Sequence, residues 1–239
     1  MTRRVVWISG ASSGIGAALA SSLPWPGAEL IGVSRRRPAV GRHLRADLAS
    51  RDGWADVTSS FDSVFAQRPD EAVFAHMAAT PGPHARSTDA DRDEYAAAVL
   101  VNGAAPLVLG AAFLGAAERH DVRAALVLCS SPAAARPMRG MSSYGSGKAA
   151  VEYWVGCVAA ELENDPRRRV IAVVPHAVDT PMVREVMSVA RTTQPVAAVL
   201  ADAAARGALA TPESTAAAIW RAVETAPSGS IVPVGAVPD

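Results

Sequence analysis

The 239-residue sequence has no excess of either charge, little cysteine and no long apolar run. Its 23 basic residues balance 23 acidic ones, which argues against nucleic acid or an anionic membrane surface as the main partner. No run of about 20 apolar residues is present, so no membrane-spanning helix is expected. The two cysteines, Cys129 and Cys157, lack metal-ligand spacing. A reduced, cytoplasmic protein without a bound metal is therefore expected.

Half of the residues are hydrophobic, and short apolar runs alternate with longer helical patterns. The runs that are apolar on both faces indicate parallel strands buried between helix layers. Strands are expected at residues 5–9, 30–34, 43–46, 72–75, 125–129, 170–175 and 231–234, and helices at 14–22, 51–65, 92–114, 143–164 and 212–225. The alternation predicts an α/β fold of Rossmann type, a doubly wound parallel sheet of about seven strands with helices on both faces. No linker-like boundary appears, so residues 1–239 are expected to form a single domain.

Two late segments carry specific expectations. Pro233 lies in the last strand candidate, and because proline removes a ladder donor this strand should lie at the sheet edge. Residues 180–211 show no strand pattern and are rich in alanine. This segment is expected to be a helical excursion that forms a lid over a substrate pocket.

The stretch ISGASSGIG, residues 8–16, follows the first strand and precedes the first helix. Free amides at a helix N-terminus attract anions, and glycines let a pyrophosphate approach the backbone closely. The residues expected to hold phosphates are Gly10, Ser12, Ser13, Gly14, Ile15 and Gly16. The alternative is a tight turn without a ligand, since a glycine motif alone is weak evidence.

The second strand candidate ends in Ser34, Arg35 and Arg36. Proteins that bind NAD usually place a carboxylate here, which accepts hydrogen bonds from the ribose hydroxyls. Guanidinium groups in its place favour the extra phosphate of NADP. The alternative is a solvated basic loop.

A tyrosine and a lysine lie four residues apart at the start of a predicted helix, as Tyr144 and Lys148. Residues at that spacing share one helix face. A nearby ammonium and a positively charged oxidised nicotinamide would favour the phenolate and are expected to lower the pKa of Tyr144. Tyr144 could then exchange a proton with a carbonyl oxygen. The hydroxyl of Ser131, at the end of the preceding strand, could hold that oxygen. An ordinary surface pair is the alternative reading of Tyr144 and Lys148.

Together, these motifs resemble the short-chain dehydrogenases/reductases over nearly the whole chain. The glycine loop fits the pattern T-G-x-x-x-G-x-G with Ser9 in the first place, and Ser131 precedes Tyr144 by the family's 13 positions. The resemblance implies a catalytic set of Asn102, Ser131, Tyr144 and Lys148, in which Lys148 also holds the nicotinamide ribose. It implies adenine contacts from Asp47 and Leu48. Residues 130–148 and 179–182 look most like sepiapterin reductase and the bacterial benzil reductases.

Two family motifs are altered. The usual N-N-A-G after the fourth strand is replaced, because His76 and Met77 stand at the asparagine positions and Ala78 is followed by a second alanine. His76, Met77 and Ala78 are expected near the cofactor, with His76 a structural replacement held by hydrogen bonds. The usual P-G after the sixth strand is Pro175-His176. His176 should adopt ordinary backbone angles, and its ring either faces the substrate or lies in an exposed loop.

The resemblance therefore implies NADP(H) as cofactor and a small-molecule carbonyl as substrate. Further cofactor contacts are expected from Pro175, His176, Val178 and Thr180. The substrate pocket is expected to contain Ser131, Met138, Met141, Tyr144, His176 and Met182. The expected activity is an NADPH-dependent reduction of a ketone or diketone, and a homodimer or tetramer is expected. The alternatives are a non-catalytic NADPH sensor or scaffold, and a dehydrogenase that oxidises an alcohol.

Overall fold

The structure is a computed structural model that describes residues 2–235, and within them seven parallel strands form one sheet in the order β3-β2-β1-β4-β5-β6-β7. The strands are β1 (Arg4–Ser9), β2 (Glu29–Ser34), β3 (Arg42–Arg45), β4 (Glu71–His76), β5 (Arg123–Cys129), β6 (Arg168–Pro175) and β7 (Ile231–Val234). The helices are α1 (Gly14–Ser21), α2 (Arg51–Phe65), α3 (Arg92–Val99), α4 (Ala105–Arg119), α5 (Ser142–Glu161), α6 (Pro181–Met187), α7 (Val196–Ala205) and α8 (Pro212–Thr225). The single-domain, doubly wound fold expected from the sequence is confirmed.

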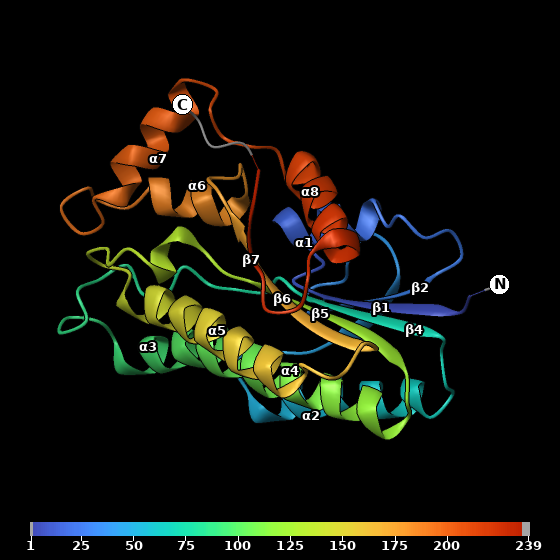
Figure 1. The fold of residues 1–239 in the computed structure, drawn as a ribbon. Helices are drawn as coiled ribbons and strands as arrows, with labels where there is room; N and C mark the ends of the chain where they lie inside the picture. The colour runs from blue at the N-terminus through green and yellow to red at the C-terminus, as the bar shows by residue number, and fades with distance from the viewer. Residues whose placement is uncertain (1, 236–239) are drawn as a thin grey trace.

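Helices cover both faces of the sheet (Figure 1). Side chains alternate between the two faces along each strand, so β1 sends Val5 and Trp7 to one hydrophobic core and Val6 and Ile8 to the other. The first core packs against α2, α4 and α5, and the second against α1 and α8. Burial on both faces explains why the strands read as continuous apolar runs.

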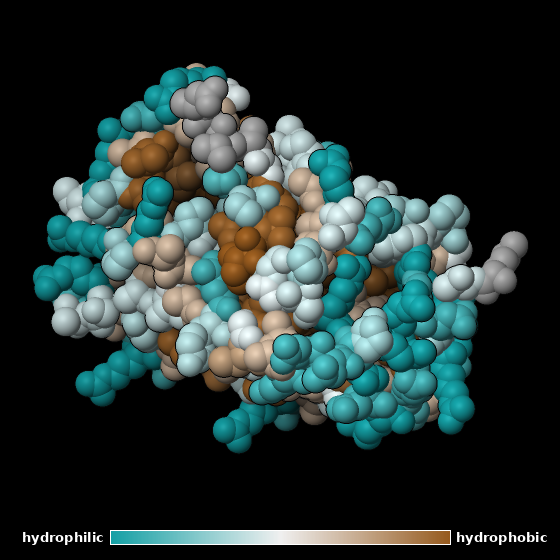
Figure 2. Space-filling model, viewed as in Figure 1, coloured by the Kyte–Doolittle hydropathy of each residue, from teal (hydrophilic) through white to brown (hydrophobic). Residues whose placement is uncertain are grey.

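The last strand lies at the edge of the sheet, as Pro233 predicts. Only β6 pairs with β7 among the described residues. Apolar side chains reach the surface over this strand (Figure 2), where Ile231 is 40% exposed. The proline leaves one fewer free donor on this edge, which limits pairing with other strands.

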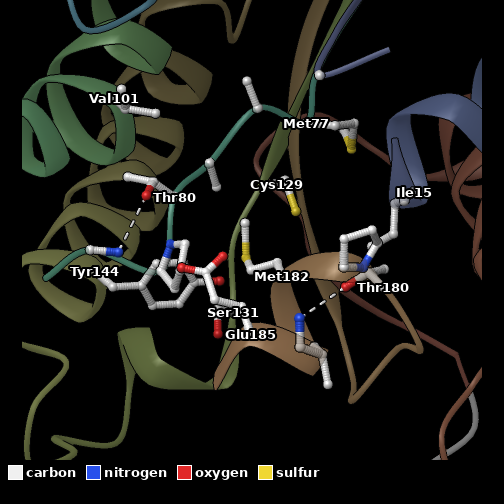
Figure 3. Close-up of a pocket in the computed structure, with 18 of the residues that line it drawn as sticks. Ile15, Met77, Thr80, Val101, Cys129, Ser131, Tyr144, Thr180, Met182 and Glu185 are labelled. Carbon is white, nitrogen blue, oxygen red and sulfur yellow. Dashed lines mark hydrogen bonds between the residues drawn. The ribbon is translucent and has the colours of Figure 1, made fainter. Parts of the chain in front are cut away.

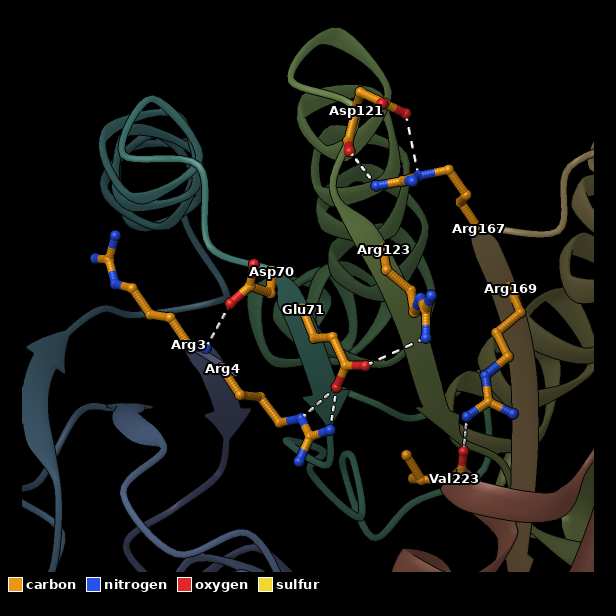
Figure 4. A network of polar contacts seen from close by, with 9 residues as sticks. All are labelled: Arg3, Arg4, Asp70, Glu71, Asp121, Arg123, Arg167, Arg169 and Val223. Carbon is orange, nitrogen blue, oxygen red and sulfur yellow. Dashed lines mark hydrogen bonds and ion pairs between the residues drawn. The ribbon is translucent and has the colours of Figure 1, made fainter. Parts of the chain in front are cut away.

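Ion pairs tie the amino ends of neighbouring strands together, on the side of the sheet away from the glycine loop (Figure 4). Glu71 on β4 accepts from Arg4 Nε on β1 at 2.8 Å and from Arg123 Nη1 on β5 at 3.4 Å. Arg169 on β6 donates to the carbonyl of Ala226 at 3.1 Å and so holds the C-terminal end of α8. These contacts leave the opposite, carboxyl ends of the strands open for function.

One helical stretch, Arg92–Arg119, is long and apolar enough to cross a membrane by length and composition. It consists of α3, a π-helical turn (Leu100–Ala104) and α4. Leu109 and Phe113 of this stretch are fully buried in the core against the sheet, as expected for a layer helix of this fold. The sequence predicted one helix over 92–114 and missed both the π turn and the last turn.

Candidate active site

A cavity of about 770 Å³ opens at the carboxyl ends of the strands. It lies where the order of the strands reverses, because β1 connects to β2 on one side and has β4 on the other. Open α/β sheets bind their ligands at this switch point. The lining comes from the glycine loop, from the loops after β2, β4, β5 and β6, and from α6 and α7 of the 180–211 segment.

The glycine loop has the geometry of a phosphate cradle. Gly10 and Gly14 have φ angles of +72° and +54°, which other residues rarely adopt. A Cβ atom on Gly16 would lie 2.4 Å from the carbonyl oxygen of Gly10, so only glycine lets α1 start this close to the turn. Ser13 precedes α1 without capping it through its side chain, which leaves first-turn amides free for an anion. The loop therefore fits the pyrophosphate of a dinucleotide.

The far end of the cavity, beside β2 and β3, is basic. Ser34, Arg35, Arg36, Asp47 and Leu48 all line it. Arg35 and Arg36 are exposed, and neither pairs with a carboxylate among residues 2–235. Two unpaired guanidinium groups at this place fit a phosphate on the adenosine ribose.

Ser131 and Tyr144 line the cavity at its other end. Ser131 follows β5 and its Oγ accepts from the amide of Ala133 at 3.2 Å, while Tyr144 lies in the first turn of α5. Lys148 lies one turn further along α5, 1% exposed, and its Nζ is 5.6 Å from the centre of the Tyr144 ring. The Nζ atom donates to the carbonyl of Cys129 at 2.7 Å. Lys148 thus lies behind Tyr144 and does not line the cavity.

The expectation that Lys148 lowers the pKa of Tyr144 below its usual value is wrong. Burial of the phenol raises the pKa of Tyr144 to about 12, and the hydrogen bond with Ser131 lowers it only in part. Burial also lowers the pKa of Lys148. The ammonium is occupied by a backbone carbonyl, and the low polarity around the phenol dominates. Tyr144 is therefore a protonated phenol at neutral pH, which suits a proton donor.

The substrate end is mostly apolar, and Figure 3 shows part of it. Met138, Met141 and Met182 line it, as does the imidazole of His176. His176 has ordinary backbone angles, since the only described non-glycine residues with positive φ are Arg68 and Asp121. Three titratable side chains that the sequence did not single out also line the cavity: His84, Glu94 and Glu185. His84 lies in the loop after β4, Glu94 in the first turn of α3 and Glu185 within α6, and no recognisable sequence motif marks them.

The sequence matches the family model described as enoyl-(acyl carrier protein) reductase over residues 10–228. The chain belongs to the short-chain dehydrogenases/reductases. It is therefore an oxidoreductase of a family that uses nicotinamide dinucleotides. The match spans the glycine loop, the Ser131–Tyr144–Lys148 group and the 180–211 segment.

Relatives agree with this assignment. The chain is 25% identical to benzil reductase ((S)-benzoin forming) of Bacillus cereus, over 96% of this chain and 98% of the relative. A solved short-chain dehydrogenase/reductase family protein superposes with a TM-score of 0.74 at 25% identity, with 98% and 97% of the two chains covered. A 4-hydroxyisoleucine dehydrogenase complexed with NADH shares the fold, with a TM-score of 0.75 at 16% identity and coverage of 97% and 96%.

Asn102, at the family's asparagine position, is part of a structural hydrogen-bond pair in this chain. Asn102 is fully buried in the π-helical turn. Its Oδ1 accepts from the amide of Thr80 at 3.0 Å and its Nδ2 donates to the carbonyl of Thr80 at 2.9 Å. A Cβ atom on Gly147 would lie 2.8 Å from the Asn102 carbonyl carbon, so α5 approaches this turn very closely. Asn102 does not line the cavity, and its side chain fixes the loop after β4. Such π turns occur often at functional sites.

The residues of the altered motif after β4 differ in whether they line the cavity. Met77 and Ala78 line the cavity, and the Ala78 amide donates to Ser9 Oγ at 3.0 Å. His76 is 2% exposed, does not line the cavity and packs edge-on against Phe74. Neither of its ring nitrogens has a hydrogen-bond partner among the described residues. The expectation that His76 is held by hydrogen bonds is therefore wrong, because no described residue offers its ring nitrogens a polar partner.

Replacement of His76 by phenylalanine should remove a source of acid instability. Burial, followed by the charge of Lys148, lowers the pKa of His76 from 6.5 to about 3. The folded protein thus resists protonation at this site, so stability present above pH 6.5 is lost as the pH falls towards 3. Between pH 7 and 4 the wild type should lose about 3 kcal/mol more than His76→Phe. Urea unfolding at both pH values measures this, with His120→Gln as the control. Equal acid sensitivity of wild type and His76→Phe would contradict the assignment.

Proposed function

We propose that this reductase uses NADPH to reduce the carbonyl group of a small or aromatic ketone or diketone. The observation that carries the proposal is one continuous cavity. It joins a glycine cradle and two free arginines at one end to Ser131 and Tyr144 at the other. The similarity to benzil reductase supports a diketone as substrate.

The chain's own residues supply the positioning and the proton. Bound NADPH would provide the reducing equivalent as a hydride. Ser131 donates a hydrogen bond to the substrate oxygen, and Tyr144 gives the same oxygen a proton as negative charge develops on it. Lys148 and Asn102 hold their surroundings in place, since Lys148 binds the end of β5 and Asn102 binds the loop after β4. Thr180, Val178 and Pro175 close the nicotinamide side of the cavity.

A panel of carbonyl compounds tests this function. The panel contains benzil, 1-phenylpropane-1,2-dione, simple aryl ketones and an enoyl thioester, each assayed with NADPH and NADH. We expect a diketone to give a hydroxyketone with one NADPH consumed per product. NADPH binding without turnover of any compound would favour the sensor alternative. Turnover of alcohols with NADP⁺, and of no carbonyl compound, would favour an oxidative dehydrogenase.

We also propose a homodimer in the cytoplasm, paired through the outer faces of α4 and α5. Val108 on α4 is 46% exposed and Tyr153 on α5 is 80% exposed. Large apolar side chains exposed on adjacent helices suit an interface between copies of the chain. Light scattering after size exclusion should give twice the chain mass, and a monomer that Tyr153→Lys leaves unchanged would contradict this pairing.

A further inference from the structure

A chain of hydrogen bonds links three segments around the substrate end of the cavity. Gln194, in the 180–211 segment, is fully buried, and its Nε2 donates to the carbonyl of Gly140 at 2.6 Å. Its Oε1 lies 3.0 Å from His84 Nδ1, and His84 Nε2 lies 3.1 Å from Glu185 Oε1. Gly140 has a φ of +75°, and a Cβ atom there would lie 2.6 Å from Gln194 Cγ. The loop before α5 is therefore shaped to receive this glutamine.

The carbonyl of Gly140 fixes the orientation of the Gln194 amide, and with it the bond to His84 Nδ1. The Gln194 amide nitrogen must face Gly140, because a carbonyl only accepts, so the amide oxygen faces His84. His84 Nδ1 is then a donor. Its Nε2 faces the carboxyl group of Glu185 at 3.1 Å. Glu185 is thus oriented by a histidine that Gln194 anchors through the other ring nitrogen.

Glu185 projects from α6 into the cavity that also contains Ser131 and Tyr144 (Figure 3). Only its Oε1 is engaged among the described residues, which leaves Oε2 free to accept. A carboxylate oriented by a hydrogen-bonded histidine is a preorganised acceptor. Its side-chain conformation is restricted before a ligand binds, so binding costs less conformational entropy.

The charge of the lining differs between the two ends. The lysines and arginines that line the cavity within residues 2–235 are Arg35 and Arg36, both at the end beside β2. Two acidic side chains, Glu94 and Glu185, also line the cavity, and neither forms an ion pair with a lysine or arginine among residues 2–235. An anionic group would meet a carboxylate without a neutralising guanidinium or ammonium, whereas a cation would find a favourable partner.

We propose that Glu185 selects carbonyl substrates that carry a protonated amine, which donates to Oε2. His84 and Gln194 are positioning residues that act through Glu185. The inference rests on the proposed carbonyl reduction and names its substrate class. A charge-assisted hydrogen bond favours a cationic donor by about ten- to a hundredfold. Glu185 has 57% of its side chain exposed, so screening reduces that value and about a tenfold preference is expected.

The test compares aryl ketones that differ at one ring substituent: aminomethyl, hydroxymethyl, methyl and carboxymethyl, each at the meta and para positions. Wild type should show a kcat/KM about tenfold higher for an aminomethyl ketone than for its methyl counterpart, and the lowest value for the carboxymethyl ketone. Glu185→Gln should abolish the aminomethyl preference through KM, so that kcat/KM for the aminomethyl and methyl ketones becomes nearly equal.

Matched variants separate charge selection from loss of structure. Glu213→Gln removes an exposed carboxylate on α8, outside the cavity, and should leave the preference intact. His84→Asn should raise KM for the aminomethyl ketone more than KM for the methyl ketone, and Glu185→Asp should restore part of the preference. An aminomethyl preference that is absent from wild type, or that persists in Glu185→Gln, would overturn the inference even where the methyl ketone is reduced. Lack of turnover of every ketone would instead reject the proposed carbonyl reduction.

Discussion

Tyr144→Phe should lower kcat for ketone reduction about a thousandfold or more and leave NADPH binding nearly unchanged. Loss of a positioned proton donor typically costs 10²–10⁴-fold. The phenol is protonated at neutral pH because burial raises its pKa to about 12, so the hydroxyl supplies a proton that phenylalanine lacks. The ring itself is retained, so the cavity wall keeps its shape. Steady-state kinetics measure turnover, and quenching of protein fluorescence measures NADPH binding.

Tyr153→Phe is the matched control, since Tyr153 lies on the same helix and is 80% exposed. It should keep wild-type kcat. A Tyr144→Phe protein with more than about a tenth of wild-type turnover would show that another group supplies the proton.

Arg35→Asp should reverse the cofactor preference. The wild-type guanidinium groups at the basic end of the cavity have no carboxylate partner among residues 2–235, so they are free to pair with the ribose phosphate of NADPH. Loss of one charge-assisted contact, together with repulsion from the new carboxylate, should reduce kcat/KM for NADPH about 100-fold. NADH lacks this phosphate, so kcat/KM for NADH should be the same as in the wild type or higher. The measurement is the ratio of kcat/KM for the two cofactors.

Arg37→Asp provides the control for this change. Arg37 is exposed in the same loop but does not line the cavity, so its replacement should shift the ratio only slightly. A ratio that Arg35→Asp leaves unchanged would show that Arg35 does not contact the ribose phosphate. An equal fall with NADPH and NADH would indicate a general loss of binding instead.

Most of the sheet could be predicted from the sequence because five of its strands, β1, β2, β4, β5 and β6, are largely buried on both faces. Runs such as Val5–Ile8 are apolar without interruption, and the glycine loop follows the first of them directly. The cavity lining was largely predictable for the same reason. Parallel strands end at one edge, so Ser34, Ser131 and Pro175 had to converge there. The resemblance to the family added Asp47 and Thr180, which also line the cavity.

Features that depend on packing between distant segments could not be predicted. The π turn at Asn102 depends on the close approach of Gly147, 45 positions later. His84 and Gln194 meet across 110 residues, and no spacing rule connects a loop histidine to a glutamine in a different loop. The sequence predicts the wrong effect of Lys148 on the pKa of Tyr144, because the nearby charge is visible in the sequence but the depth of burial is not.

The most direct test of carbonyl reduction is the transfer of deuterium from labelled cofactor. Wild-type protein is incubated with 1-phenylpropane-1,2-dione and NADPH that carries deuterium at one of the two C4 positions, and the hydroxyketone is analysed by mass spectrometry. Only one of the two labelled cofactors should deliver a single deuterium to the carbinol carbon. A hydroxyketone without deuterium from either cofactor, or no hydroxyketone at all, would contradict direct reduction of this carbonyl by the protein.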